Sequence, residues 1–147
     1  AWWPGHIRAG GANDAPTITL DVMPTLLALV GIKPPEDRSL DGIDLSPLLL
    51  TGKDLPSRPL FWASLSNRGS RSEAMREGPW KLVVRHPEAK PGSFGNESVE
   101  LYRLDRDPGE QDDLAEQHAE RAAAMLKKLK DWYADTQRTA TKQPGGW

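Results

Sequence analysis

The stretch from Ser72 to Asp113 constrains the fold of this chain more than any other. It contains an apolar segment, Trp80 to Val84, and a strongly alternating segment, Val99 to Leu104. Runs of this length and pattern are typical of β-strands. Antiparallel pairing of the two predicts a small sheet. Alternate residues of the second segment then face opposite sides, and both sides carry apolar groups.

Two further segments extend the predicted sheet. Leu60 to Leu65 begins directly after Pro59, and proline is tolerated at the first position of a strand but not inside one. A short polar segment from Ser72 then ends at Glu77-Gly78-Pro79, where glycine and proline are expected to interrupt the strand. We therefore expect about four antiparallel strands.

The C-terminal third has the periodicity of a long amphipathic helix. From about Leu114 to Gln137 there is no glycine or proline, and the composition is rich in alanine. Apolar residues recur at spacings of three and four, namely at Ala122, Met125, Leu126, Leu129, Trp132 and Tyr133. This stripe must be buried, and the sheet is the available surface. The polar, glycine-rich tail 138–147 is expected to be flexible.

The N-terminal third predicts two shorter helices. One lies near Asp21 to Val30, with Gly31 as its stop, and the second spans about Leu45 to Leu50. Ala1 to Trp3 is an apolar run that Pro4 stops, which is typical of a strand end. We therefore expect the chain to begin midway through a larger fold. It also begins without methionine and without the pattern of a signal peptide.

Composition excludes several classes of function. The 147 residues are 37% hydrophobic, which is enough for one core. The net charge of -2 gives no basic surface for nucleic acid, and no apolar run is long enough to span a membrane. Because there is no cysteine, disulfides, thiol catalysis and cysteine-based zinc sites are excluded.

A search for metal-binding patterns is negative. An acidic run invites a calcium interpretation: Asp105, Asp107, Glu110, Asp112 and Asp113. A calcium-binding loop needs glycine at its sixth position, which here is Glu110, so we favour a tight turn instead. The three histidines, His6, His86 and His118, lie far apart in the sequence, and none has a second ligand at helical spacing. His86 and His118 are interpreted as surface residues rather than metal ligands.

Five segments occur in a characteristic order along about 115 residues. They are Trp3-Pro4-Gly5-His6-Ile7 with Gly10, then residues 20–31 (LDVMPTLLALVG), 40–49 (LDGIDLSPLL), 75–82 (MREGPWKL) and 100–110 (ELYRLDRDPGE) with Asp113-Leu114. Taken together, these segments resemble the C-terminal portion of the arylsulfatase-like, formylglycine-dependent sulfatases.

The resemblance implies an α/β fold. It would be the C-terminal part of an alkaline-phosphatase-like sulfatase fold, ending in a small antiparallel sheet packed on a long helix. Residues 1–57 would be a remnant of the catalytic α/β domain, and residues 58–137 would form the C-terminal subdomain. The expected partner of this chain is its own N-terminal catalytic domain.

The resemblance also implies chemistry that this chain does not itself carry. Sulfatases hydrolyse sulfate esters with a formylglycine nucleophile beside a calcium ion, and by analogy those residues would lie upstream of Ala1. We therefore assign no catalytic residue and no metal ligand here, and we expect the isolated chain to be inactive. The full-length protein would act on a sulfated small molecule or glycan, with the periplasm or the exterior favoured as its location.

One short segment imitates the sulfatase nucleophile motif. Pro56-Ser57-Arg58 matches the end of that motif, in which a cysteine or serine stands two residues before the proline. Here that position is Asp54, and aspartate cannot be oxidised to an aldehyde. The segment is better explained as a turn that leads into the strand beginning at Leu60.

Two arginines are candidate contacts for an anionic substrate. Arg68 and Arg71 lie in the polar connection from Ala63 to Ser72, and guanidinium groups suit sulfate oxygens. The alternative is that both are solvated loop residues.

Two other functions stay open. The chain could be a stand-alone, non-catalytic module that binds glycan or protein, with some of its six tryptophans as stacking platforms, at positions 2, 3, 62, 80, 132 and 147. It could also derive from a sulfatase relative whose catalytic half has decayed. A binding module should fold alone, whereas a sulfatase fragment should expose the apolar faces of Trp2, Trp3 and Val22 to Val30 that its partner covers.

Overall fold

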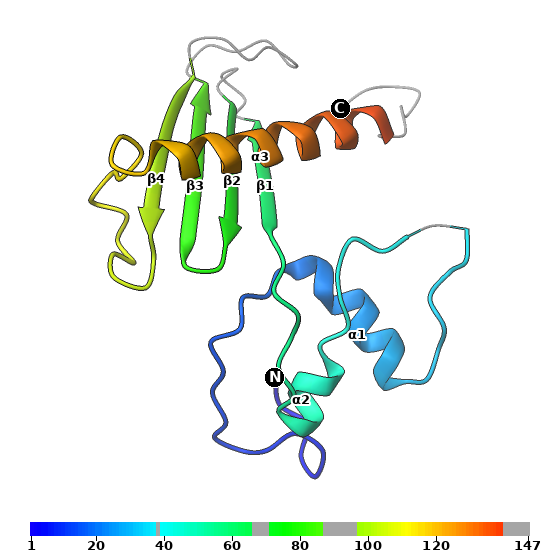
Figure 1. The fold of residues 1–147 in the computed structure, drawn as a ribbon. Coiled ribbons are helices and arrows are strands. Elements are labelled where there is room, and N and C mark those ends of the chain that lie inside the picture. The colour runs from blue at the N-terminus through cyan, green and yellow to red at the C-terminus, as the bar shows by residue number, and fades with distance from the viewer. Residues whose placement is uncertain (38, 66–70, 87–96, 140–147) are drawn as a thin grey trace. The chain divides into compact units, whose positions relative to one another are not determined.

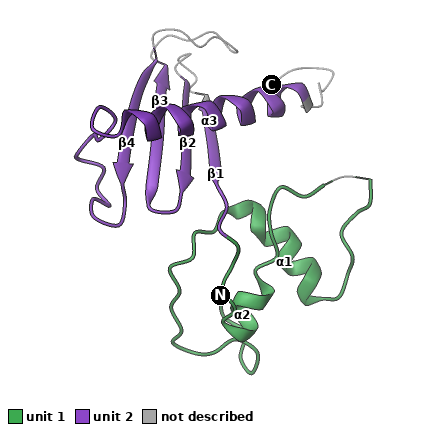
Figure 2. Cartoon of the chain, viewed as in Figure 1, with its two compact units in different colours: residues 1–56 green, residues 57–147 purple. Residues whose placement is uncertain are grey.

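The computed structural model describes residues 1–37, 39–65, 71–86 and 97–139. The chain divides into two compact units, Ala1–Pro56 and Ser57–Trp147 (Figure 2). The first unit contains a 3₁₀ helix η1 (Thr19–Asp21) and the helices α1 (Val22–Leu29) and α2 (Ser46–Thr51). The second contains the strands β1 (Leu60–Leu65), β2 (Arg71–Glu77), β3 (Trp80–His86) and β4 (Ser98–Arg103) and the helix α3 (Ala119–Thr139).

The two short helices of the first unit lie where the sequence predicts them. Helix α1 ends just before Gly31, whose φ of 71° is the left-handed conformation that suits a residue following a helix. Helix α2 has a proline in its first turn, and it is followed by Gly52 in the same left-handed conformation. The two helices contact each other.

The structure differs from the prediction of a strand end at Ala1–Trp3. In the described part of the chain, β1 is the first strand. The backbone N–H groups of His6 and Ile7 both donate to the carbonyl oxygen of Trp3, at 3.1 and 2.9 Å, and close a turn there. A strand also needs a neighbouring strand to complete its hydrogen bonds, and none of the described strands pairs with these residues.

The second unit is built on a four-stranded antiparallel sheet with the order β1-β2-β3-β4. One cross-strand row runs Phe61, Met75, Leu82, Leu101, and the next row runs Trp62, Ala74, Val83, Glu100. Because side chains alternate along a strand, these two rows face opposite sides of the sheet. The predicted alternation in β4 is confirmed, since Leu101 lies in the buried core whereas Glu100 takes part in polar contacts on the other side.

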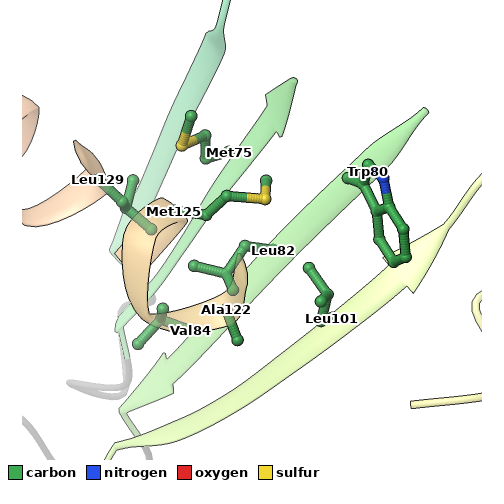
Figure 3. Close-up of a cluster of buried hydrophobic side chains, with 8 residues drawn as sticks. All are labelled: Met75, Trp80, Leu82, Val84, Leu101, Ala122, Met125 and Leu129. Carbon is green, nitrogen blue, oxygen red and sulfur yellow. The ribbon is translucent and has the colours of Figure 1, made fainter. Parts of the chain in front are cut away.

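Helix α3 lies across one face of the sheet and contacts all four strands (Figure 1). Its inward stripe of Ala122, Met125 and Leu129 packs on the sheet, as predicted. Figure 3 shows the buried cluster that results, which consists of Met75, Trp80, Leu82, Val84, Leu101, Ala122, Met125 and Leu129. Phe61 of β1 stacks on Trp132 with ring centroids 5.0 Å apart, which extends the apolar contact toward the end of α3.

The helix begins five residues later than the sequence predicts, at Ala119 rather than Leu114. The backbone N–H of Leu114 donates to the carbonyl oxygen of Leu101 at 2.8 Å, and the Asp113 carboxylate accepts from the Leu101 N–H at 2.9 Å. The residues at the start of the expected helix therefore form hydrogen bonds with the backbone of Leu101 in the edge strand β4. Leu114 still packs against the core from this position.

The other element bounds differ by small amounts from the predicted ones. Strand β3 runs two residues past Val84, to His86. Helix α3 continues to Thr139, which includes the start of the expected flexible tail, and residues 140–147 lie outside the described residues. None of the helices in the described ranges has the length and apolar content needed to cross a lipid bilayer.

Candidate functional site

The structure places the two candidate substrate contacts differently. Arg68 lies outside the described residues. Arg71 is the first residue of β2, on the sheet face that α3 covers, and only 3% of its surface is exposed. The sequence suggests a solvent-facing connection at this position, but the strand begins early enough to bury the side chain. Its role as a substrate contact stays a prediction.

Arg71 belongs to a buried polar cluster with Glu73 and His86. Glu73 lies two residues along β2 and so faces the same side, and His86 is the cross-strand partner of Arg71 on β3. The Arg71 guanidinium forms an ion pair with the Glu73 carboxylate, and Glu73 Oε2 lies 2.7 Å from His86 Nε2. Glu73 and His86 are only 2% and 1% exposed. Charges this deep need close partners, because burial removes their hydration.

The contacts of His86 indicate where one proton lies. Nε2 is 2.7 Å from the Glu73 oxygen but 3.3 Å from Arg71 Nη2. One ring nitrogen cannot donate to the carboxylate and also accept from the guanidinium. The shorter contact favours an N–H on Nε2 that donates to Glu73.

Helix α3 completes the surroundings of this cluster. The Arg71 guanidinium carbon lies 4.8 Å from the centre of the Tyr133 ring, in a cation–π contact. The cluster thus joins the start of β2, the end of β3 and the C-terminal half of α3. In the described residues its chemistry is that of a structural ion pair, with a positive and a negative group held together out of water.

The prediction that His86 is a surface residue is wrong. Trp80, Leu82, Val84 and His86 alternate along β3 toward α3, so the inward series continues two residues beyond the expected strand end. Continuing the period of two from Val84 would have found it. His6 is exposed, and so is His118, as expected for the latter. His118 makes an edge contact with Trp80, with ring centroids 4.9 Å apart.

The acidic run after β4 is organised as a turn. Asp107 Oδ2 accepts the backbone N–H groups of Gln111 and Asp112, at 2.8 and 3.0 Å, and Asp105 pairs with Arg103. The hydrogen bond from Arg103 lowers the pKa of the Asp105 carboxyl group. Because these carboxylates are engaged with backbone donors and a cation, they do not fit a calcium site. No group of three or more potential metal ligands occurs among the described residues.

A second polar group lies on the sheet face opposite α3. The Tyr102 hydroxyl donates to Glu100 Oε2 at 3.0 Å, and Arg85 Nε lies 3.1 Å from each oxygen of the same carboxylate. Burial, followed by the hydrogen bond and charge of Glu100, raises the pKa of Tyr102 to about 12. Glu100 also raises the pKa of the Arg85 guanidinium above its ordinary value. Nothing in this group resembles a nucleophile poised near neutral pH.

The similar proteins of known function reported below are both sulfatases. N-acetylgalactosamine-6-sulfatase of Sus scrofa is 42% identical over 81 residues, covering 55% of this chain and 15% of that protein. Arylsulfatase A of Homo sapiens is 35% identical over 144 residues, covering 88% of this chain and 28% of that protein. The chain is a sulfatase homologue. No family model matches it.

Solved structures agree with this relationship. The protein yidJ of Bacteroides fragilis, provisionally assigned as a sulfatase, superimposes with a TM-score of 0.61 at 26% identity, over 80% of this chain and 24% of that chain. The structure of Ps i-CgsB gives a TM-score of 0.75 over 99% of this chain and 29% of that chain; at 23% identity this likeness shows the fold alone.

These neighbours confirm the predicted fold class. The small antiparallel sheet packed on a long helix is consistent with the C-terminal portion of the alkaline-phosphatase-like sulfatase fold. The chain spans between about one seventh and somewhat more than one quarter of the length of the relatives described above. The activity of a whole sulfatase therefore enters as a proposal.

Proposed function

We propose that this chain forms the C-terminal part of a sulfatase, and that the complete protein hydrolyses sulfate esters. The observation that carries the proposal is the 35% identity to human arylsulfatase A, which extends over 88% of the chain. By the same relationship, the substrate is a sulfated small molecule or glycan. A location outside the cytoplasm, in the periplasm or secreted, is part of the proposal.

The proposed contribution of the chain is structural. Sulfatases use a formylglycine and a calcium ion, and we assign neither to the described residues of this chain. It has no cysteine, Asp54 occupies the nucleophile position of the one motif-like segment, and the carboxylates of the acidic turn are already engaged. We therefore derive no catalytic step from these residues, and we expect the chain alone to be inactive.

A chimaeric enzyme tests the proposal. The portion of human arylsulfatase A that this chain matches is replaced by the chain, and hydrolysis of 4-nitrophenyl sulfate is measured. We expect release of nitrophenol from the chimaera and none from the isolated chain. A well-folded chimaera without activity, or activity in the isolated chain, would contradict the proposal.

The two arginines are tested in the same chimaera. If Arg68 and Arg71 contact a sulfated substrate, reversal of the charge at Arg68 should raise KM. An unchanged KM for Arg68→Glu would remove Arg68 from the substrate site. Arg71 is less suited to this test, because its burial with Glu73 makes any substitution affect the fold as well.

A second candidate is a stand-alone glycan-binding module, favoured by one observation. Trp62 is 42% exposed, and it lies in the cross-strand row that faces away from α3. Exposed tryptophan rings stack on sugar faces. Calorimetric titration of the isolated chain with a sulfated glycan, repeated with Trp62→Ala, separates the candidates. Binding that depends on Trp62 would favour the module.

A further inference from the structure

Helix α1 is apolar except for Thr25, and much of its apolar surface is exposed. Pro24 and Thr25 are buried, as is Asp21, which lies just before the helix. Its exposed residues include Leu26 and Val30, which are 57% and 66% exposed. A helix normally buries its apolar side and exposes its polar side. The exposure of these apolar side chains needs a physical cause.

On the inner side of α1, the polar groups of Asp21 and Thr25 already form hydrogen bonds within this chain. The Asp21 carboxylate accepts the N–H groups of Ile18 and Ile43, at 2.9 and 3.0 Å. The Thr25 hydroxyl donates to the Asp21 carbonyl and accepts the N–H of Leu45 at 2.9 Å. Gly42 makes this close approach possible, since a Cβ there would lie 2.0 Å from the Leu20 carbonyl oxygen. The loop before α2 is therefore held against this side.

The outer side is uniformly apolar. Val22, Leu26 and Val30 recur at intervals of four, so they lie along one face of the helix. We define the outer face of α1 as the apolar residues, in the helix or directly beside it, that are more than half exposed: Leu20, Val22, Met23, Leu26, Val30 and Ile32. No charged residue occurs from Val22 to Ile32. Contiguous apolar surface of this kind marks an interaction site.

We propose that the outer face of α1 is the surface that docks onto the catalytic portion of a sulfatase. This inference rests on the proposed function and names the partner surface. The relatives have 72% to 85% of their length outside the stretch that matches this chain, so they possess further structure that can cover the face. The occupant is an apolar surface of that portion, since a face without charge or unpaired polar groups is complementary to apolar side chains.

The composition of α1 argues against a lipid surface. Helices that lie on membranes carry lysine and arginine on their polar side to bind anionic lipid headgroups. The polar residues at α1 are Thr25 and, just before the helix, Asp21; both are turned inward and bonded to the chain. The face is therefore assigned to protein.

Thiol labelling tests the inference directly, because the chain has no cysteine of its own. Leu26→Cys places a thiol on the outer face of α1, and Ala123→Cys places the control on the exposed side of α3. Each variant is made in the isolated chain and in the arylsulfatase A chimaera. The rate of reaction with N-ethylmaleimide is followed by mass spectrometry of the peptide that carries the position.

We expect both positions to react at similar rates in the isolated chain. In the chimaera, position 26 should react at least about ten-fold more slowly, since a buried thiol is inaccessible to the reagent, whereas position 123 should be unchanged. Equal reaction of position 26 in a chimaera that hydrolyses sulfate ester overturns the docking inference and leaves the proposed function intact. Protection without hydrolysis contradicts the proposed function and supports the docking surface.

Two further outcomes also decide the matter. Protection of position 26 in the isolated chain that grows with protein concentration would assign the face to a second copy of the chain, and so overturn the inference. Precipitation of the chimaera, with position 26 reactive in the fraction that stays in solution, would show that the catalytic portion does not cover the face and would also overturn it.

Discussion

Helices α1 and α3 differ in whether their apolar residues are buried within this chain. Each carries an apolar stripe, but α3 buries its stripe on the sheet, with Leu129 only 2% exposed, whereas α1 leaves Leu26 57% exposed. The second unit therefore contains its own apolar core, whereas the interior of the first unit includes the hydrogen-bonded Asp21 and Thr25. An apolar stripe therefore predicts that the stripe is buried, but it does not predict that the surface covering it belongs to the same stretch of chain.

The largest expected effect falls on the buried ion pair of the second unit. Glu73→Gln leaves the Arg71 charge in the interior without its carboxylate, which should lower the free energy of unfolding by roughly 3–5 kcal/mol. Urea unfolding followed by circular dichroism measures the change. The control is Arg85→Gln, which breaks a pair whose arginine is 58% exposed and should cost less than about 1 kcal/mol. Equal losses for the two variants would refute the assignment of Arg71–Glu73 as a buried pair.

A matched pair of leucine substitutions tests the comparison of the helices. Leu129→Ala removes side-chain volume from the core and should cost about 2–5 kcal/mol. Leu26→Ala acts on an exposed side chain and should change the free energy of unfolding of the isolated chain by less than about 0.5 kcal/mol. Urea titrations of both variants measure this difference. A similar cost for Leu26→Ala would mean that the outer face of α1 is buried within this chain.

Asp21→Asn should loosen the first unit and leave the second unit unchanged. The asparagine can present only one carbonyl oxygen to the two N–H groups of Ile18 and Ile43, so one of them loses its acceptor. We expect a loss of about 1–3 kcal/mol in local stability. Hydrogen exchange at the Ile43 amide measures it, with the Leu82 amide in β3 as the internal control. Faster exchange at both amides would indicate that the two units unfold together.

The smallest expected effect is a pH dependence from the sheet face opposite α3. The pKa of Tyr102 is raised to about 12, so the folded state holds this proton where the unfolded state has lost it. The stabilisation from this group is complete below the unfolded pKa near 10 and is lost as the pH rises toward 12. Ultraviolet absorbance of tyrosinate follows the titration. Tyr102→Phe should remove the late step, and Glu100→Gln should move it to lower pH; a titration that neither variant alters would contradict the assignment.

Regular periodicity explains which parts of the fold could be predicted from sequence. Strand β4 and helix α3 repeat apolar residues at the periods of their elements, and the structure confirms both. The start of α3 could not be predicted in this way, because leucine is a good helix former and Leu114 therefore favours a helix. Leu114 and the neighbouring Asp113 are instead held by hydrogen bonds to Leu101, which depend on the tertiary arrangement.

The candidate site was harder to predict than the fold. A charged residue such as Arg71 is normally exposed, so the sequence predicts either a substrate contact or a solvated loop residue at this position. Its burial depends on Glu73 and His86, which strand pairing places beside it. From the sequence, Asp21 is only the first residue of the helix expected near Asp21 to Val30. Its second bond, to Ile43, spans 22 residues and requires the fold.

The most direct measurement is the sequence of the reading frame that precedes Ala1 in the source DNA. We expect the reading frame to continue upstream into a sulfatase catalytic portion, with a cysteine or serine followed after one residue by Pro-Ser-Arg, and with aspartate and asparagine residues suited to bind calcium. A start codon a few triplets before Ala1 would contradict this account. The exposed face of α1 would then need a different partner, and a stand-alone binding module would become the better explanation.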